Sequence, residues 1–226
     1  MIGALVLAAG NGTRMGGPTP KQFLNLKGKP LYVHSVDALL PLVRTVVVVT
    51  KKEFIPSVEK ELSGTRYKGR VFVCEGGEER YDSAYRGLKQ LLTLGDYEHV
   101  LVHDAARCNV KADTILRVIR DMQECGAAVA AVPEKNTIKK ANAAGFVEQT
   151  LDRSELWEIQ TPQGFLSAHL LEGYEAFFRD PRPGITDDAS ILENYTDYPV
   201  KLSMGSYGNI KVTTQEDIGI LTNSRI

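Results

Sequence analysis

The sequence lacks most features of a secreted, membrane-spanning or cysteine-ligated protein. Its 226 residues include only three cysteines, widely spaced and odd in number, and four histidines in no metal-binding spacing. A disulfide framework or a clustered metal site is therefore not expected. No apolar run approaches the roughly 20 residues that span a bilayer. Residues 1–4 carry no basic signal region and no Arg- and Ser-rich transit sequence. We expect a soluble cytoplasmic protein.

An excess of charge of one sign is also missing. The 27 Lys and Arg residues and 28 Asp and Glu residues give a formal net charge of −1, so no global field favours nucleic acid or an anionic membrane. Internal repeats and low-complexity linkers are absent. The chain is 43% hydrophobic, which is typical of a globular domain with its own core. We expect one domain across residues 1–226, and any anion binding must come from local clusters of cations.

Short apolar runs alternate with segments of helical period. Strands are predicted at 2–8, 46–50, 71–74, 99–103 and 127–132, with helical stripes at 33–40, 84–92 and 115–122. The β-branched run at 46–50 is typical of a strand covered on both faces. This alternation predicts a three-layer, Rossmann-like α/β fold with a mostly parallel sheet. Further helices are predicted near 167–178 and 187–194, a last strand at 200–204, and a capped helix start at 214–217.

The regular alternation stops after Pro133. Residues from about 134 to 160 contain short alternating pieces around a turn at 142–145, which predicts a protruding β-hairpin arm. The arm has few residues that could form a core of its own. Such an appendage usually packs on something else, often a second subunit.

The first strand runs directly into the glycine-rich loop of "LAAGNGTRMGG". A dinucleotide-binding loop needs G-x-G-x-x-G; Gly10 and Gly12 fit, but Met15 occupies the third glycine position. A P-loop needs Lys after its last glycine, and Gly16 is followed by Gly17 instead. The dinucleotide-binding interpretation is therefore weak, and the P-loop interpretation fails.

The same loop suits phosphate in another way. Small residues let backbone N–H groups approach an anion closely, and two cations follow within the same stretch. The alternative is an ordinary turn with solvated basic side chains. The residues concerned are Ala8, Ala9, Gly10 and Gly12, with the cations Arg14 and Lys21.

"VHDAAR" places Asp104 at the carboxyl end of the fourth strand, where open α/β sheets bind ligands. A carboxylate there suits Mg²⁺ shared with a triphosphate. The alternative for Asp104 is a helix cap or a salt bridge to Arg107. His103 either supports Asp104 or is simply packed, and Cys108 is expected to be an inert thiol.

The other polar groups are ambiguous when taken singly. "GGEERYDS" carries Arg80 and Ser83 near a helix start, where the segment either recognises a nucleotide through its backbone or merely caps the helix. Arg153 on the arm and Lys211 near the end of the chain would each be read as surface cations. "GITDDAS" offers either ligands or the N-cap of the next helix.

Taken together, the blocks resemble the 2-C-methyl-D-erythritol 4-phosphate cytidylyltransferase family of the non-mevalonate isoprenoid pathway. The resemblance runs in order from "LAAGNGTRMG" and "PKQF" through "GGEER", "HDAAR", "TLDRSELW", "QTPQGF" and "TDDAS" to "NIKVTT". It covers nearly the whole chain. It implies transfer of a cytidylyl group from CTP to a sugar phosphate, with Mg²⁺, in a homodimer whose arms interlock.

The resemblance also implies roles for single residues. Arg14, Lys21, Arg153 and Lys211 would be catalytic, with Arg153 supplied by the partner's arm, and Asp104 would hold Mg²⁺. CTP would be bound by Ala8, Ala9, Gly10, Gly12, Gly77, Ser83, Asp104 and Ala105. The sugar phosphate would be bound by Arg107, Thr137, Arg153, Thr161, Thr186, Asp187 and Lys211.

The sequence departs from this family pattern at a few positions, and other functions remain as alternatives. Asn136 stands where the family usually has Asp, and Cys108 where it usually has Pro. Ribitol-5-phosphate cytidylyltransferases typically show "HDAVR" and lack the "TLDR" and "TDDAS" blocks. A catalytically silent nucleotide-binding protein would be expected to have lost Arg14, Lys21 or Asp104. A nicotinamide dehydrogenase is disfavoured by Met15.

Overall fold

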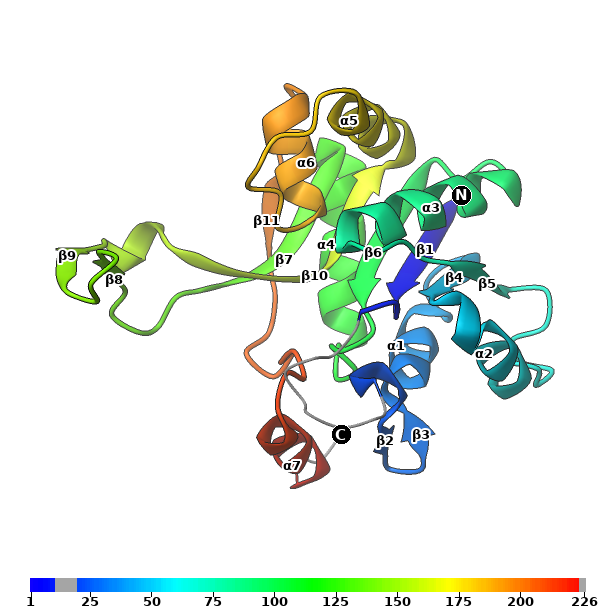
Figure 1. Ribbon diagram of the computed structural model, residues 1–226. Coiled ribbons are helices and arrows are strands. Elements are labelled where there is room, and N and C mark those ends of the chain that lie inside the picture. Colours follow the sequence, from blue (N-terminus) through cyan, green and yellow to red (C-terminus); the bar gives the residue numbers. More distant parts are fainter. Residues whose placement is uncertain (11–19, 224–226) are drawn as a thin grey trace.

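The centre of the molecule is a seven-stranded sheet with strand order β11-β7-β10-β6-β1-β4-β5. A computed structural model describes residues 1–10 and 20–223 (Figure 1). Every neighbouring pair is parallel except the two pairs that involve β10. The strands are β1 (Ile2–Leu7), β4 (Thr45–Thr50), β5 (Val71–Glu75), β6 (His99–Asp104), β7 (Ala127–Pro133), β10 (Trp157–Leu166) and β11 (Lys201–Met204).

Helices cover both faces of this sheet, as the predicted three-layer fold requires (Figure 1). One face packs against α1 (Leu31–Leu39), α2 (Ile55–Glu61) and α4 (Ala112–Cys125). The other packs against α3 (Arg80–Thr93), α5 (Ser167–Arg179) and α6 (Asp188–Tyr195). Short 3₁₀ turns are η2 (Lys21–Phe23), η3 (Lys52–Phe54) and η4 (Arg153–Glu155).

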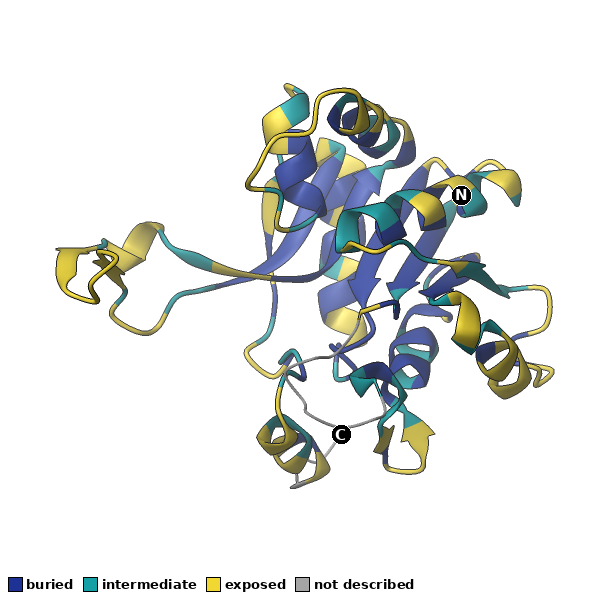
Figure 2. Cartoon of the chain, in the orientation of Figure 1, coloured by how far each residue is buried: buried dark blue, intermediate teal, exposed yellow. Residues whose placement is uncertain are grey.

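Strand β4 shows why the apolar runs form central strands. All six of its residues are buried (Figure 2). Val46 and Val48 belong to one core cluster, whereas Val47 and Val49 belong to the cluster on the opposite face. Alternate side chains of a strand point to opposite faces, so a continuous run of valines fills two cores at once.

Gly87 lets helix α3 pack directly against the sheet. A Cβ on this residue would lie 2.6 Å from a methyl group of Val49. The absence of a side chain therefore lets the helix settle onto β4 and β1. This packing fixes the N-terminal end of α3 beside the carboxyl end of β6.

Strand β10 was not predicted, and it runs against its two neighbours. Gln163 pairs with Val102 of β6 and with Val129 of β7. The register against β7 shifts between Ile159 and Gln163. The middle of the sheet is thus antiparallel at one strand, although the sheet is mostly parallel as expected.

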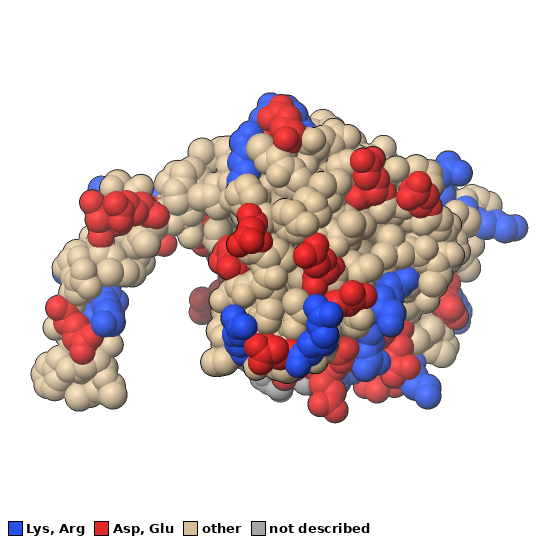
Figure 3. All heavy atoms as spheres, turned by 90° about the horizontal axis from the view of Figure 1, so that it is seen from above, with Lys and Arg blue, Asp and Glu red and all other residues tan. Residues whose placement is uncertain are grey.

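The predicted arm is present as a hairpin of β8 (Lys139–Ala141) and β9 (Val147–Thr150). It projects from the body of the molecule and is exposed along both strands (Figures 1 and 2). Figure 3 shows the arm as a narrow projection that carries charges of both signs. Lys140 Nζ and Glu148 Oε2 form an ion pair across its two strands at 3.2 Å.

The C-terminal helix α7 (Gln215–Asn223) packs beside the small hairpin of β2 (Asn25–Leu26) and β3 (Lys29–Pro30). Leu26, Leu31, Cys108, Val212 and Leu221 form a third apolar cluster there. The predicted start of this helix is confirmed, with the Asp217 carboxylate accepting the N–H groups of residues 213 and 214. In the described part of the chain, no helix is both long enough and apolar enough to cross a bilayer.

Candidate active site

Two adjoining cavities lie at the carboxyl ends of β1 and β6. Their volumes are about 190 and 350 Å³, and they share the side chains of Arg80, Asp104 and Lys211. The first cavity lies against the loop after β1 and the start of α3, and the second against β10 and the start of α6. This is the edge of an open α/β sheet where ligands usually bind.

Most of the residues singled out from the sequence line one of these cavities. The first cavity brings together Ala9, Gly10, Lys21, Ser83, Asp104, Ala105 and Lys211. The second brings together Asp104, Arg107, Thr161, Thr186, Asp187 and Lys211. Segments from the beginning, middle and end of the chain therefore meet at one place.

Asp104 is the carboxylate at the centre of both cavities. It is the last residue of β6 and only 8% exposed. Arg80 Nε lies 3.3 Å from its Oδ1, and Lys211 Nζ lies 2.7 Å from its Oδ2. Burial alone would raise the pKa of Asp104, but the charges of Arg80 and Lys211 outweigh burial and hold the pKa well below its usual range. Asp104 is therefore an anion at neutral pH.

The backbone of Asp104 is held by a chain of hydrogen bonds. Its N–H donates to Thr161 Oγ1 at 3.0 Å, and Thr161 Oγ1 lies 2.9 Å from Nδ1 of His103. The other ring nitrogen of His103 lies 3.2 Å from the carbonyl oxygen of Arg107. Because a carbonyl only accepts, Nε2 carries the proton and the Thr161 hydroxyl donates to Nδ1. Burial lowers the pKa of His103 to about 4, which keeps the ring neutral.

Arg107 does not pair with Asp104 through a salt bridge. Its Nη1 donates to the carbonyl of Asn209 at 2.6 Å and its Nη2 to the carbonyl of Ile159 at 3.1 Å. Burial lowers the pKa of Arg107, and the charge of Asp104 opposes that effect. The salt bridge to Arg107, one alternative for Asp104, is therefore wrong. Among the described residues, the cations that pair with Asp104 are Arg80 and Lys211.

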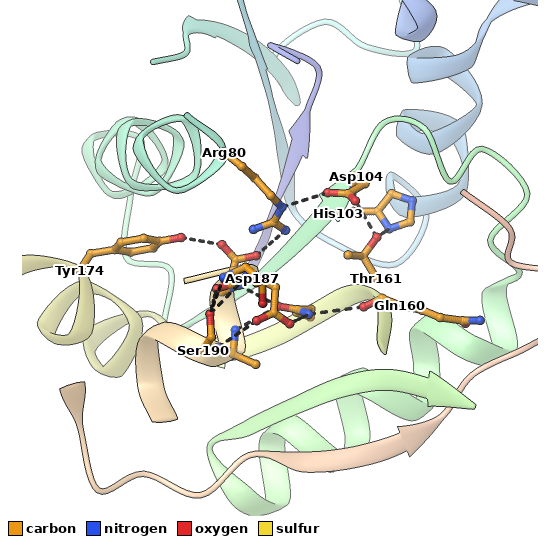
Figure 4. A network of polar contacts seen from close by, with 12 residues as sticks. Arg80, His103, Asp104, Gln160, Thr161, Tyr174, Asp187 and Ser190 are labelled. Atoms are coloured by element: carbon orange, nitrogen blue, oxygen red, sulfur yellow. Dashed lines mark hydrogen bonds and ion pairs between the residues drawn. The ribbon is translucent and has the colours of Figure 1, made fainter. Parts of the chain in front are cut away.

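Arg80 connects Asp104 to a second carboxylate. Its Nη2 lies 2.7 Å from Asp188 Oδ2, and the other oxygen of Asp188 accepts from the Tyr174 hydroxyl at 2.5 Å. Figure 4 shows Arg80 extending from α3, with Asp104 on one side and the Tyr174 hydroxyl pointing inward from α5. Asp188 is completely buried. The Arg80 guanidinium therefore links α3 and α6 to the end of β6, and α5 joins this network through the contact between Tyr174 and Asp188.

The start of α6 is fixed by Asp187 and Gln163. Asp187 Oδ1 accepts the N–H of Ser190 at 3.0 Å, and Ser190 Oγ accepts the N–H of Asp187, which makes a capping box. Gln163 Nε2 donates to Asp187 Oδ2 at 2.7 Å, and its Oε1 accepts the N–H of Asp188. The predicted N-cap at Asp187 is confirmed, and the same residue lines the second cavity.

Lys21 lies where the segment after β1 contacts the segment after β11. Its Nζ donates to the carbonyl of Val212 at 3.1 Å. Next to it, Gln22 Nε2 donates to the carbonyls of Ala8 and Gly10. These bonds hold the loop after β1 and the segment after β11 against each other beside Asp104.

The family model for IspD, 2-C-methyl-D-erythritol 4-phosphate cytidylyltransferase, matches residues 2–222. The chain belongs to this cytidylyltransferase family. Among curated relatives named 2-C-methyl-D-erythritol 4-phosphate cytidylyltransferase, it is 39% identical to that of Lachnospira eligens over 96% of both chains. It is 43% identical to that of Geobacillus kaustophilus over 95% of this chain and 92% of the relative.

Solved structures agree with the assignment to the cytidylyltransferase family. The 4-diphosphocytidyl-2C-methyl-D-erythritol synthase of Anaerococcus prevotii superimposes with a TM-score of 0.84 at 28% identity, over 98% of this chain and 96% of that one. The cytidylyltransferase of Thermus thermophilus gives a TM-score of 0.77 at 26% identity, over 96% of each chain. The predicted fold class and family are therefore confirmed.

Some residues expected from the cytidylyltransferase family line neither cavity. Arg153 and Thr137 are exposed on the arm, where Arg153 Nη1 donates to the carbonyl of Lys135 at 2.9 Å. The N–H of Gly77 is taken by Ser83 Oγ within the chain. Ala8 is buried and lines neither cavity. Gly12 and Arg14 lie outside the described residues.

Sequence reasoning gave no role to Gln163, Tyr174 and Asp188, and it placed Arg80 only in a segment that would recognise a nucleotide through its backbone or cap a helix. The structure places all four in one polar network with Asp104 and Asp187. One signal was available for Arg80. It is the first residue of α3, a position where the helix dipole disfavours a cation. An arginine there therefore indicates nearby carboxylates. No local signal identifies Tyr174, because its pattern is that of an ordinary buried aromatic residue.

The described residues contain no group of three or more His, Cys, Asp and Glu side chains that would cage a metal ion by itself. Mg²⁺ rarely needs such a cage, because it is usually held by one or two carboxylates together with substrate phosphates and water. Asp104, ionised and lining both cavities, suits that kind of site.

Proposed function

We propose that this chain transfers the cytidylyl group of CTP to 2-C-methyl-D-erythritol 4-phosphate, giving 4-diphosphocytidyl-2-C-methyl-D-erythritol and pyrophosphate. The observation that carries the proposal is the ionised Asp104 between Arg80 and Lys211, which lines two adjoining cavities, the first of which is also lined by Lys21. Family membership across residues 2–222 supplies the reaction class.

The reaction forms a bond between a phosphate oxygen of the sugar phosphate and the α-phosphorus of CTP. The bond from that phosphorus to the bridging oxygen breaks, and pyrophosphate leaves with the electron pair. A phosphate monoester has a second pKa near 6, so its oxygen is already largely ionised at neutral pH. No strong general base is therefore needed. The barrier comes from the approach of one anion to another.

Positioning and preorganised positive charge lower such a barrier. In the proposal, Lys21 and Arg14 offset charge that develops on the α-phosphate, and Lys211 lies between the two cavities. Ala9, Gly10 and Ser83 hold CTP in the first cavity. In the proposal, the other residues that bind CTP are Ala8, Gly12, Gly77, Asp104 and Ala105.

The second cavity suits the sugar phosphate because it combines hydroxyl, carboxylate and guanidinium groups. Thr161, Thr186, Asp187 and Arg107 line it. The Arg107 guanidinium donates to backbone carbonyls and not to a carboxylate, so its charge is not cancelled by a direct ion pair. That arrangement favours an anionic, hydroxyl-rich ligand.

In this proposal Asp104 is the residue that would hold Mg²⁺. Bound there, Mg²⁺ would supply neutralising charge to the phosphates of CTP. The chain's own contribution is to keep Asp104 ionised and fixed in place, through the Thr161 hydroxyl at its backbone and Arg80 and Lys211 at its carboxylate.

We also propose that the domain spanning residues 1–226 works as a homodimer and that the arm completes the partner's site. The arm exposes Phe146 and Val147 at its tip, 72% and 63% accessible. Such apolar exposure on a projection indicates an interface. Thr137 and Arg153 lie on the same projection, outside the cavities of their own chain. Reaching a partner's second cavity would give both residues a role with the sugar phosphate.

The first experiment is pyrophosphate release from CTP with Mg²⁺, using 2-C-methyl-D-erythritol 4-phosphate in one arm and ribitol 5-phosphate in the other. Release with the first substrate alone is expected. Release with ribitol 5-phosphate alone would overturn the substrate while keeping cytidylyl transfer. No release with either substrate, by a folded protein that binds CTP, would favour a silent nucleotide-binding protein.

Mixed dimers test the arm. Lys21→Ala and Arg153→Ala subunits are each expected to be nearly inactive alone. In a mixed dimer, one site combines an intact Lys21 with an intact Arg153 from the other subunit. Activity should therefore return when the two inactive proteins are unfolded, mixed and refolded. If it does not return while mixed dimers are verified by mass, Arg153 does not act across subunits.

A further inference from the structure

A chain of polar contacts runs from α5 and α6 through α3 to Asp104, and the proposed reaction gives no role to its far members, Tyr174 and Asp188. Tyr174 donates to Asp188, Asp188 pairs with Arg80, and Arg80 pairs with Asp104. The side chain of Asp188 is completely buried, with 0% of its surface exposed. Arg80 and Asp188, which pair in this chain of contacts, lie 108 positions apart in the sequence.

We propose that Arg80 is a positioning residue that fixes the Asp104 carboxylate, and that Asp188 and Tyr174 act through it. The inference rests on the proposed function, in which Asp104 is the carboxylate that serves CTP and Mg²⁺. Arg80 itself needs no contact with either substrate for this role.

The distances support a positioning role. Arg80 lies closer to Asp188, at 2.7 Å, than to Asp104, at 3.3 Å. Asp188 therefore draws part of the guanidinium charge away from Asp104. Were Asp188 neutral, Asp104 would be the one remaining carboxylate of the described residues in direct contact with Arg80, and the two would pair more tightly. A tighter pair would compete with a divalent cation for the Asp104 oxygens.

The geometry also limits the rotation of Asp104. Arg80 holds Oδ1 and Lys211 holds Oδ2, so both oxygens have a cationic partner. The planar guanidinium can bridge two carboxylates at once, which a lysine ammonium does less well. Tyr174 fixes the far end by donating to the second oxygen of Asp188 at 2.5 Å. The position of Arg80 is thus determined before any ligand enters.

Stability alone is a poor explanation for this chain. Burying an ion pair costs desolvation that the attraction between its charges often fails to exceed, and apolar replacements are frequently as stable. Asp188 is fully buried while its partner Arg80 is 27% exposed, and this pair between α6 and α3 is accordingly better explained by a requirement for defined geometry. Residues that orient a metal-binding carboxylate typically change metal affinity or activity by about 10–100-fold when altered.

The test compares Asp188→Asn with a matched control, Asp121→Asn. Asp121 is also a buried carboxylate, held by the Ser203 hydroxyl at 2.6 Å and by Lys201 at 3.1 Å, but it joins α4 to β11 and lines neither cavity. Both variants lose a buried charge. Only Asp188→Asn is expected to lower kcat, by about 10–100-fold, with the KM for CTP nearly unchanged.

Binding of Mn²⁺, followed by its electron paramagnetic resonance signal in the presence of CTP, gives a readout besides activity. Affinity should fall about tenfold or more in Asp188→Asn and stay unchanged in Asp121→Asn. Tyr174→Phe should show the same pattern with a smaller effect. Normal kcat and Mn²⁺ affinity in Asp188→Asn, or losses that follow melting temperature across all three variants, would overturn the inference.

A double variant tests whether Asp188 acts through Arg80. Arg80→Met alone leaves Asp188 buried without its cation, whereas Arg80→Met with Asp188→Asn is neutral and should fold better. If Asp188 acts only through Arg80, the double variant gains stability over Arg80→Met without gaining kcat. Recovery of kcat together with stability would show a merely structural role.

The inference can still be tested if Asp188→Asn does not fold or if the proposed function is wrong. If Asp188→Asn fails to fold, Arg80→Lys retains a cation for Asp188 and should still lower Mn²⁺ affinity, because one ammonium cannot bridge both carboxylates in the same way. If the unaltered protein releases no pyrophosphate, the proposed function fails. The Mn²⁺ comparison then still supports or overturns the role of Arg80.

Discussion

The hydroxyl of Thr161 should be worth far more to stability than one ordinary hydrogen bond. It accepts the backbone N–H of Asp104 at 3.0 Å and donates to Nδ1 of His103, which is fully buried. Thr161 itself is 4% exposed. Thr161→Val keeps the shape of the side chain but removes both interactions, so two buried polar groups lose their partner in the protein.

The magnitude follows from those two groups. Leaving one buried donor or acceptor unsatisfied costs about 1–3 kcal/mol, so the loss of a partner by two groups in Thr161→Val should lower the free energy of unfolding by about 2–6 kcal/mol. For a protein of this size, each kcal/mol shifts the melting temperature by about 2–4 °C. We therefore expect a fall of about 4–24 °C, measured by circular dichroism on heating and by urea denaturation.

Two controls bracket this expectation. Thr161→Ser retains the hydroxyl and should cost about 1 kcal/mol or less. Thr45→Val removes a buried hydroxyl from β4 that has the single side-chain partner Tyr97 OH, and should cost about 1 kcal/mol. The reasoning is refuted if Thr161→Val is no more destabilising than Thr45→Val.

Three further predictions concern single side chains. Lys21→Ala should lower kcat by about 10²–10³, because its ammonium lines the first cavity; near-normal turnover would contradict the proposed role. Burial raises the pKa of Cys108 from 9.0 to about 11. Near pH 8 the fraction of Cys108 in the reactive thiolate form is therefore about 100-fold lower than for a cysteine of ordinary pKa, and this fraction increases as the pH rises towards 11. Iodoacetamide should therefore label the exposed Cys125 first, as read by mass spectrometry, without loss of activity. Asp187→Ala should lose about 1 kcal/mol of stability by removing the cap that Ser190 N–H uses, measured by urea denaturation.

Much of the fold could be predicted because buried strands leave a plain pattern. The valine run of β4 fills the cores on both faces, so its hydrophobicity is continuous and unmistakable. Strand β10 left no such pattern. Gln160, Thr161 and Gln163 interrupt it with polar side chains that are nevertheless buried. They are polar because their partners are polar groups of the site, which periodicity cannot reveal.

The site could be predicted where its residues lie at the ends of strands or in sequence motifs that resemble the cytidylyltransferase family. Asp104 and Lys211 were found this way, and the structure places them 2.7 Å apart. Arg80 and Asp188 lie inside blocks that were also recognised, "GGEER" and "TDDAS". Their pairing was not foreseen, because two residues 108 positions apart meet only once α3 and α6 have packed on the same face of the sheet.

The direction of β10 explains why the arm and the site occur together. Parallel β7 ends at Pro133 on the carboxyl edge, and the chain leaves there to form the arm. It must re-enter at the same edge, so β10 runs antiparallel, with Trp157 opposite Pro133. The middle of β10 then delivers Thr161 and Gln163 to the second cavity. In the proposed dimer, the same edge that sends the arm to a partner also completes the site that receives the partner's Arg153.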